Sequence, residues 1–291
     1  MIKVNSLSGG KTSSYIAANY PADYDVFALV RIEHEQSKFP DKKIRQEVED
    51  RIQAPFIATA EDDMIIYTML DLEQYIGRKI TWVTGETFDK VINIKSKNKT
   101  FIPQVTARFC TTKMKLLPIM DWWFKEVSEI VDMRIGFRAN ETKRVKSVLS
   151  RCDVNGISED NIRIEINEDK NDKWKYLKWR KPSFPLVNDN IYKDNIEVYW
   201  KGKPVRFAWQ NNCIGCFHAT PLNLQRKSKM FPKKFDWFVQ KEKESIKDYN
   251  GRKWHKGDYG GITYEQIQKW NLQTELFDDD FNECDSGYCG I

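Results

Sequence analysis

A short glycine loop near the amino terminus constrains the fold of this chain more than any other feature. Residues 1–5 (MIKVN) are β-prone, residues 8–14 (SGGKTSS) combine adjacent glycines with a lysine and hydroxyl side chains, and residues 15–20 (YIAANY) are suited to a helix. A strand, a glycine loop and a helix in this order hold a phosphate. The glycines let backbone N–H groups approach the anion, and the helix N-terminus adds partial positive charge. A plain glycine turn is the alternative.

The loop is not of the Walker type. That motif places a spacer of several residues between its first glycine and a Gly-Lys-Ser/Thr group. Here Gly9 and Gly10 are adjacent, and Lys11 follows them directly. The sequence therefore predicts a different kind of nucleotide loop.

The first half of the chain alternates strand-like and helical segments. Strands are predicted at residues 25–31, 56–60, 79–83 and 131–137, and helices at residues 41–52, 64–76 and 116–128. Such alternation favours parallel strands joined by crossover helices, and ligands of these sheets bind beyond the carboxyl ends of the strands. We therefore expect an α/β protein with a doubly wound, mostly parallel sheet and the glycine loop at its ligand edge.

The pattern degrades after about Val145. Residues 158–173 are charged and predict a surface excursion, and residues 181–186 (KPSFPL) predict a break in regular structure. We expect residues 1–185 to form a nucleotide-binding domain. Residues 186–291 form a Cys-, Trp- and Lys-rich carboxyl-terminal extension.

Composition narrows the class of protein. Hydrophobic residues make up 41% and charged residues 31% of the 291 residues, which is typical of a soluble globular protein with a substantial core. No apolar run approaches the ~20 residues that span a bilayer, and no signal-peptide pattern is present. We expect a cytoplasmic protein with no membrane partner. The net charge of +5 permits a nucleotide or nucleic acid as partner without demanding one.

The cysteines form the second candidate site. In a reducing compartment, clustered thiols indicate a metal or redox site rather than disulfides. Cys213 and Cys216 form a C-x-x-C pair, whose spacing lets both thiolates bind one metal centre. Cys110 is the best third ligand, and the fourth is Cys289, Cys284 or no protein group. This set suits an iron–sulfur cluster, with zinc as the alternative.

Basic side chains accompany both candidate sites. Arg108 and Lys115 flank Cys110, and the segment after the strand at 131–137 carries Arg138, Glu141 and Arg144. Arginine is suited to bidentate phosphate recognition, so these guanidinium groups are candidate anion ligands. An ordinary basic surface and a structural Arg–Glu pair are the alternatives.

Taken in order, these motifs resemble those of the phosphoadenosine phosphosulfate (PAPS) reductase family, within the PP-loop ATP pyrophosphatase superfamily. The matching motifs are SGGKTS at 8–13, RFCT at 108–111, GFRANE at 136–141 and the C-x-x-C pair at 213–216. The family includes sulfonucleotide reductases and the iron–sulfur sulfurtransferase of DNA phosphorothioation. The resemblance covers nearly the whole chain. It implies a Rossmann-like PP-loop fold, ATP or a related adenine nucleotide with Mg²⁺, and an iron–sulfur cluster.

The resemblance also implies site residues. The nucleotide-binding set is Ser8, Gly9, Gly10, Lys11, Thr12, Ser13, Arg108, Gly136, Arg138, Glu141 and Arg144. The candidate metal ligands are Cys110, Cys213, Cys216 and Cys289, and the candidate catalytic residues are Lys11, Arg138 and Cys289.

Three positions depart from the family's patterns. Thr12 stands where many ATP-cleaving members have an aspartate that can help to place magnesium. Thr111 follows Cys110, where adenylyl-sulfate reductases have an adjacent pair of cysteines. Cys289 begins a Cys-Gly-Ile end that resembles the reductases' nucleophile motif, without the histidine that follows it there.

Three functions follow from these patterns. In the favoured one, ATP adenylates an acceptor oxygen, and sulfur then replaces AMP, with a sulfur donor or a nucleic acid as possible partner. In the second, Cys289 attacks the sulfur of PAPS or adenylyl sulfate, and a thioredoxin-like partner resolves the product. The third is a zinc-stabilised nucleic-acid-binding module. The Gly-Gly-Lys loop favours the first, because it suits a triphosphate better than the serine-rich loop of the reductases.

Overall fold

A six-stranded sheet forms the centre of the molecule. The computed structural model describes residues 1–94, 98–166, 172–249, 251–255 and 261–270. The strand order is β5-β2-β1-β8-β10-β9, and all neighbours are parallel except β10 and β9. The strands are β1 (Lys3–Leu7), β2 (Tyr24–Leu29), β5 (Ile80–Thr84), β8 (Val131–Arg134), β9 (Ser158–Glu165) and β10 (Lys173–Ser183). Two short antiparallel pairs join β3 (Arg31–Ile32) to β4 (Ala58–Thr59) and β6 (Asn93–Ile94) to β7 (Lys99–Thr100).

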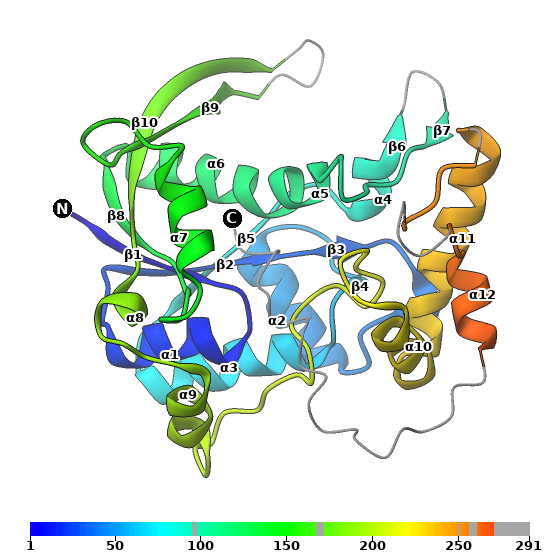
Figure 1. Cartoon of the computed structure of the whole chain (residues 1–291), viewed down its shortest axis with the longest axis horizontal. Helices are drawn as coiled ribbons and strands as arrows, with labels where there is room; N and C mark the ends of the chain where they lie inside the picture. Colours follow the sequence, from blue (N-terminus) through cyan, green and yellow to red (C-terminus); the bar gives the residue numbers. More distant parts are fainter. Residues whose placement is uncertain (95–97, 167–171, 250, 256–260, 271–291) are drawn as a thin grey trace.

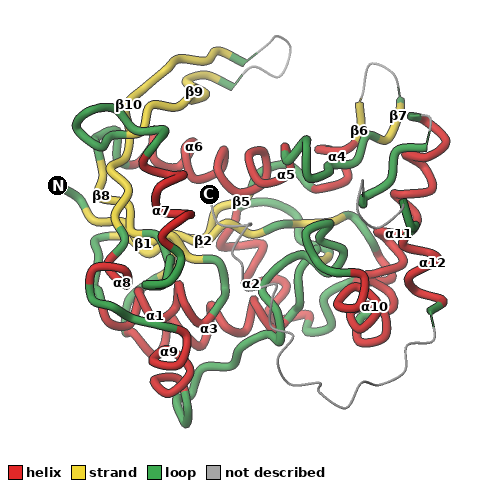
Figure 2. Tube along the Cα trace, in the orientation of Figure 1, coloured by secondary structure: helices red, strands yellow, loops and turns green. Residues whose placement is uncertain are grey.

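Helices cover both faces of this sheet (Figures 1 and 2). The first group is α1 (Lys11–Asn19), α2 (Lys42–Ile52), α3 (Met64–Ile76), α8 (Pro185–Asn188) and α9 (Lys193–Trp200). Opposite α1 and α3 lies α6 (Leu117–Glu126), preceded by α4 (Phe88–Ile92), α5 (Phe109–Thr111) and a π-helix (Thr112–Leu116). The remaining helices are α7 (Thr142–Leu149), α10 (Pro221–Met230), α11 (Pro232–Asp248) and α12 (Tyr264–Lys269). The predicted α/β class with a mostly parallel sheet is confirmed.

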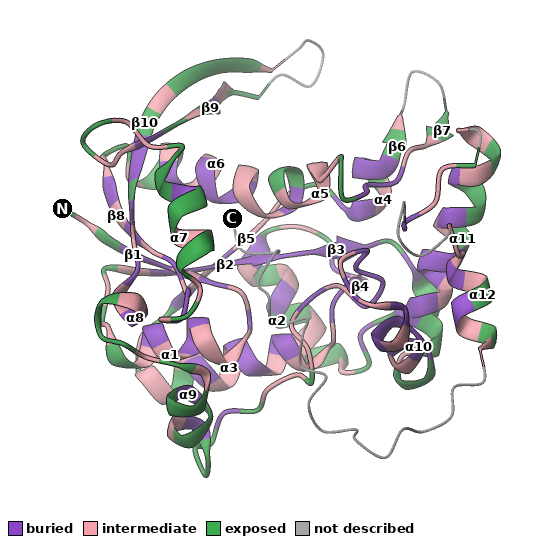
Figure 3. Cartoon of the chain, in the orientation of Figure 1, coloured by how far each residue is buried: buried purple, intermediate pink, exposed green. Residues whose placement is uncertain are grey.

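Alternation of apolar side chains along the strands builds a core on each face. In β2, Val26 and Ala28 join the cluster that contains Trp123 of α6, whereas Phe27 and Leu29 join the cluster around α1 and α3. Both faces are therefore buried (Figure 3), which is the arrangement that a parallel sheet requires.

Local sequence signals define several helix ends. The side chain of Asp41 accepts hydrogen bonds from the N–H groups of Lys43 and Ile44 at the start of α2. Helix α3 ends at Gly77, whose φ of 64° is the left-handed conformation that glycine adopts at low cost. The predicted helices at 41–52 and 64–76 therefore begin and end close to where the structure has them.

The segment 158–173, expected to be a surface excursion, contains strand structure that the sequence did not indicate. Strands β9 and β10 form an antiparallel hairpin, and β10 continues through Pro182 to Ser183 beside β8. Pairing with β9 ends at Arg180, which leaves one side of Pro182 without a strand partner, so the missing N–H is tolerated there. The outer part of β10 is exposed from Lys173 to Tyr176, so it carries none of the hydrophobic pattern that predicts a buried strand.

The carboxyl-terminal helices pack against the end of the sheet. A third core joins Val30 and Ile32 to Ile214 and Phe238, and the core around α1 and α3 includes Trp200. Each of these cores thus draws residues from both sides of residue 185, and the predicted division into two domains stays a prediction. Within the described part of the chain, no helix has the length and apolar character needed to cross a membrane.

Candidate functional site

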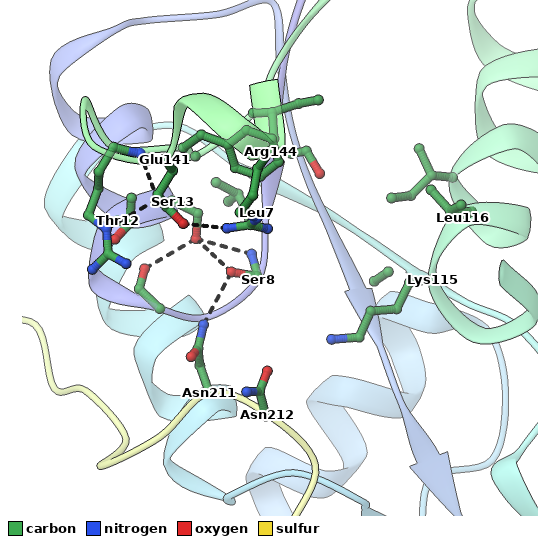
Figure 4. Close-up of a pocket in the computed structure, with 18 residues that line it drawn as sticks. Leu7, Ser8, Thr12, Ser13, Lys115, Leu116, Glu141, Arg144, Asn211 and Asn212 are labelled. Atoms are coloured by element: carbon green, nitrogen blue, oxygen red, sulfur yellow. Dashed lines mark hydrogen bonds and ion pairs between the residues drawn. The ribbon is translucent and has the colours of Figure 1, made fainter. Parts of the chain in front are cut away.

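A hollow lies at the carboxyl ends of β1 and β8, which are neighbours in the sheet. It encloses about 840 Å³ of space not filled by protein atoms, a volume that includes the solvent at its open mouth. Among the residues predicted to bind a nucleotide, those that line it are Ser8, Gly10, Thr12, Ser13, Gly136, Arg138, Glu141 and Arg144. Figure 4 shows residues from the first loop and from α7 facing the same space.

The glycine loop is held by its own hydroxyl groups. The Oγ of Ser13 accepts a hydrogen bond from the N–H of Ser8 at 3.1 Å and donates one to the carbonyl of Gly10 at 3.1 Å. Gly10 is the N-cap of α1 and has no side chain to occupy the first N–H groups of the helix. These N–H groups are hydrogen-bond donors at the edge of the hollow, and this end of α1 is therefore suited to bind an anion.

Two arginines line the hollow beside the loop. Glu141 accepts hydrogen bonds from the backbone N–H of Arg138 at 2.7 Å and from its Nε at 3.2 Å. The same carboxylate accepts from Arg144 at 2.5 Å, and the guanidinium of Arg144 lies 3.9 Å from the centre of the Phe137 ring. Glu141 thus positions two cations whose combined charge exceeds its own, and this part of the lining keeps a net positive charge.

A lysine completes the hollow from a third direction. Lys115, presented by the π-helix, reaches toward the space from the side opposite Arg144 and Glu141 (Figure 4). Its Nζ lies 2.8 Å from Oε1 of Glu61, whose side chain is fully buried. A buried carboxylate thus holds this ammonium group at the lining of the hollow.

Three predicted nucleotide ligands lie elsewhere. The ammonium of Lys11 points away from the hollow and forms an ion pair with Glu197, beside a separate surface depression. Gly9 is packed against the side chain of Ile65. Arg108 is not part of the lining of the hollow and lies near His218 instead. Burial lowers the pKa of His218 to about 4, and the charge of Arg108 adds to that lowering.

The C-x-x-C segment forms one tight turn. The N–H of Cys216 donates to the carbonyl of Cys213 at 3.1 Å. A Cβ on Gly215 would lie 2.3 Å from Cγ of Phe238, so only glycine allows the turn to approach α11 this closely. Cys110 and Cys213 pack against the same apolar cluster.

The four cysteines that the structure describes do not line the hollow, although the chain neighbours of Cys213 do. Asn211 and Asn212 are part of the lining of the hollow and directly precede Cys213. The segment that carries Cys213 and Cys216, called the thiol loop below, therefore starts at the edge of the hollow. No group of three or more His, Cys, Asp and Glu side chains arranged for a metal ion is found among the described residues. Cys284 and Cys289 lie outside those residues.

Sequence reasoning missed Asn211, Asn212 and Glu61. The amide of Asn211 donates to Oγ of Ser8 at 3.4 Å, and a Cβ on Gly10 would lie 2.3 Å from the Asn211 Nδ2. Adjacency to Cys213 was the one available signal for the two asparagines. For Glu61 the sequence carries no signal, because its partner Lys115 is 54 positions away.

Burial of His255 predicts an acid-sensitive fold. Burial disfavours the imidazolium ion and lowers the pKa of His255 to about 4 from its usual 6.5. In the unfolded chain this imidazole binds a proton below about pH 6.5, whereas in the folded protein it does so only below about pH 4. The free energy of unfolding therefore falls as the pH is lowered through this range. By about pH 5 this residue reduces the free energy of unfolding by about 2 kcal/mol.

His255→Gln removes the titrating group. Urea unfolding at about pH 7.5 and about pH 5 should show a loss of stability on acidification that is about 2 kcal/mol smaller in the variant than in the wild type. Equal losses in the two proteins would contradict the assignment.

No family model, curated protein or solved structure matches this chain. The resemblance to PAPS reductases thus rests on its motifs.

Proposed function

We propose that the hollow binds the phosphate groups of an adenine nucleotide, ATP in the favoured case, and that the chain is an enzyme of the PAPS reductase-like, PP-loop type. One observation carries the proposal: the glycine loop, Arg138, Arg144 and Lys115 surround a single space at the carboxyl ends of two parallel strands. Backbone N–H groups, a helix N-terminus and guanidinium groups are the donors that proteins use for phosphate.

The proposed reaction begins with adenylation. An acceptor oxygen attacks the α-phosphorus of ATP, the bond between the α-phosphorus and its bridging oxygen breaks, and pyrophosphate leaves. A sulfur nucleophile then attacks the activated acceptor atom, and AMP departs with the acceptor oxygen. Arg138, Arg144 and Lys115 would offset the charge that develops on the phosphates, while the loop between Ser8 and Ser13 holds them in place.

Magnesium would sit mainly on the nucleotide. Thr12 and Ser13 offer hydroxyl groups to the hollow. Glu141, the one carboxylate among the described residues of its lining, is already engaged by two arginines. This donor set is consistent with a Mg²⁺ ion held largely by phosphate oxygens and water, as is usual for this ion.

The thiols of the C-x-x-C turn are the candidate ligands of a metal–thiolate centre beside the nucleotide. Cys213 and Cys216 share one turn, and Cys110 packs on the same cluster as Cys213. These residues would hold an iron–sulfur cluster, with Cys289 as the predicted fourth ligand. The cluster would supply a binding site for the transferred sulfur.

Pyrophosphate release tests the proposed adenylation. Protein purified without oxygen should bind ATP in a calorimetric titration and release pyrophosphate when candidate oxygen acceptors are added. Iron, sulfide and zinc analysis of the same sample identifies the metal. Failure of the metal-loaded protein to bind any adenine nucleotide would overturn the proposal.

Sulfite production separates the reductase alternative. If PAPS or adenylyl sulfate yields sulfite, and Cys289→Ser abolishes that yield, the reductase assignment replaces sulfur transfer. One zinc ion per chain, with neither iron nor nucleotide binding, would favour the nucleic-acid-binding module.

A further inference from the structure

Lys227 is a lysine buried next to the C-x-x-C turn. It lies on α10, its residue is 1% exposed, and its ammonium donates to the carbonyl of Cys213 at 3.3 Å. Within the described part of the chain it forms no ion pair, and this carbonyl is its one hydrogen-bond acceptor. An exposed lysine in this position would need no explanation, whereas a buried one does.

Burial of an ammonium group is unfavourable without a partner. Removing such an ion from water costs several kcal/mol, which a single carbonyl at 3.3 Å does not offset. Lys234 on the adjacent helix α11 shows the usual solution. It is 5% exposed, and its ammonium donates to Oδ1 of Asp63 at 2.6 Å and to the carbonyl of Glu61 at 2.7 Å. Among the described residues, Lys227 has no carboxylate within ion-pair distance. The charge of Lys227 does act on the Asp62 carboxyl, whose pKa is raised by burial and partly lowered again by nearby cations, but the two form no direct ion pair.

The thiol loop is where a counter-charge can form. Thiols become anionic thiolates when they bind a metal, and the resulting centres carry negative charge next to their backbone. The contact of Lys227 with the carbonyl of Cys213 places its charge against the turn that carries both loop thiols. A metal bound to these thiols would therefore bring a negative charge close to the ammonium group of Lys227.

We propose that Lys227 is a positioning residue that serves as the buried counter-cation of an anionic metal–thiolate centre on the Cys213–Cys216 turn. The proposal rests on the metal–thiolate part of the proposed function. A hydrogen bond that merely braces the loop is the competing role. The two roles differ in what charge removal does to the metal-free protein.

Lys227→Met and Lys227→Gln separate these roles. Methionine removes both charge and donor, whereas glutamine keeps an N–H donor for the Cys213 carbonyl and removes the charge. The probes are Co²⁺ added without oxygen to the reduced protein, read by sulfur-to-cobalt absorption, and iron with sulfide, read as the metal retained against a chelator. Both variants should bind metal about 10–100-fold more weakly than the wild type, as for other residues around metal ligands. The metal-free Lys227→Met protein should resist urea as well as the wild type or better, because an unpaired buried charge has gone.

Arg180→Met is the matched control. Arg180 is also a buried cation, 5% exposed and without an ion pair among the described residues, but it contacts Met133 in the sheet. Its replacement should leave cobalt affinity unchanged. A Lys227→Gln protein that binds cobalt as the wild type does would show that the hydrogen bond, not the charge, matters, and would overturn the proposal. Equal loss of stability in metal-free and metal-loaded Lys227→Met would do the same.

The two proposals fail in different ways. A wild-type protein that takes up neither cobalt nor iron overturns both the counter-cation role and the metal part of the proposed function. Normal metal uptake by the wild type with unchanged uptake by the Lys227 variants overturns the counter-cation role alone.

Discussion

Gly9→Ala is expected to lower the free energy of unfolding by about 2–5 kcal/mol and to abolish nucleotide binding. Gly9 has a φ of 79°, which is unfavourable for any residue with a Cβ. An added Cβ would also lie 2.5 Å from Cγ2 of Ile65, a buried methyl group that has no free space to enter. The loop must therefore shift, and with it the N–H groups that face the hollow.

Gly77→Ala is the matched control for this substitution. Gly77 has a similar φ of 64°, but nothing lies within 4 Å of an added Cβ. The Gly77→Ala variant should lose about 1–2 kcal/mol of its free energy of unfolding, because only the backbone conformation becomes unfavourable. It should bind nucleotide as the wild type does. Urea unfolding and calorimetric titration with ATP measure both effects. Equal losses of stability in the two variants would show that contact with Ile65 does not constrain the loop.

Arg138→Met is expected to weaken nucleotide binding by about 10–100-fold, the loss that follows removal of a hydrogen bond to a charged group. The guanidinium of Arg138 lines the hollow and is held by Glu141 at 3.2 Å. Arg144 remains paired with the same carboxylate in the variant, so Glu141 is not left without a cation. The fold should therefore survive, as urea unfolding would verify.

Arg134→Met controls for the loss of an arginine from the same strand. Arg134 ends β8, and its guanidinium donates to the carbonyls of Tyr20 and Pro21 rather than facing the hollow. Its replacement should leave ATP affinity within about twofold of the wild type, since it removes no contact to the anion. Equal weakening by both substitutions would point to a general effect of charge and would argue against a phosphate site at Arg138.

Prediction from the sequence succeeded where neighbours along the chain decide the outcome. The helices predicted at 41–52 and 64–76 and the strand predicted at 25–31 depend on residues a few positions apart, such as Asp41 at the start of α2 and Gly77 at the end of α3. The grouping of Ser8 with Arg138 was also predicted. It follows from a general rule, because the carboxyl ends of adjacent parallel strands meet at one edge of the sheet.

Prediction failed where solvent exposure removes the pattern. The outer part of β10 is exposed, so its lysines and aromatic residues look like a loop in sequence. Pro182 added a second misleading signal, since a proline is compatible with a strand only where one side lacks a partner.

The amino-acid sequence by itself determined the α/β class and the glycine loop, because glycine conformation and apolar periodicity act over short distances. Only the tertiary structure decided which cations face the hollow. Lys11 turns to Glu197, and Lys115 is held in place by Glu61, each across a long separation in the chain. The direction in which a flexible charged side chain points depends on the carboxylates that folding brings near it. Because those carboxylates are distant in the sequence, short-range sequence patterns do not predict them.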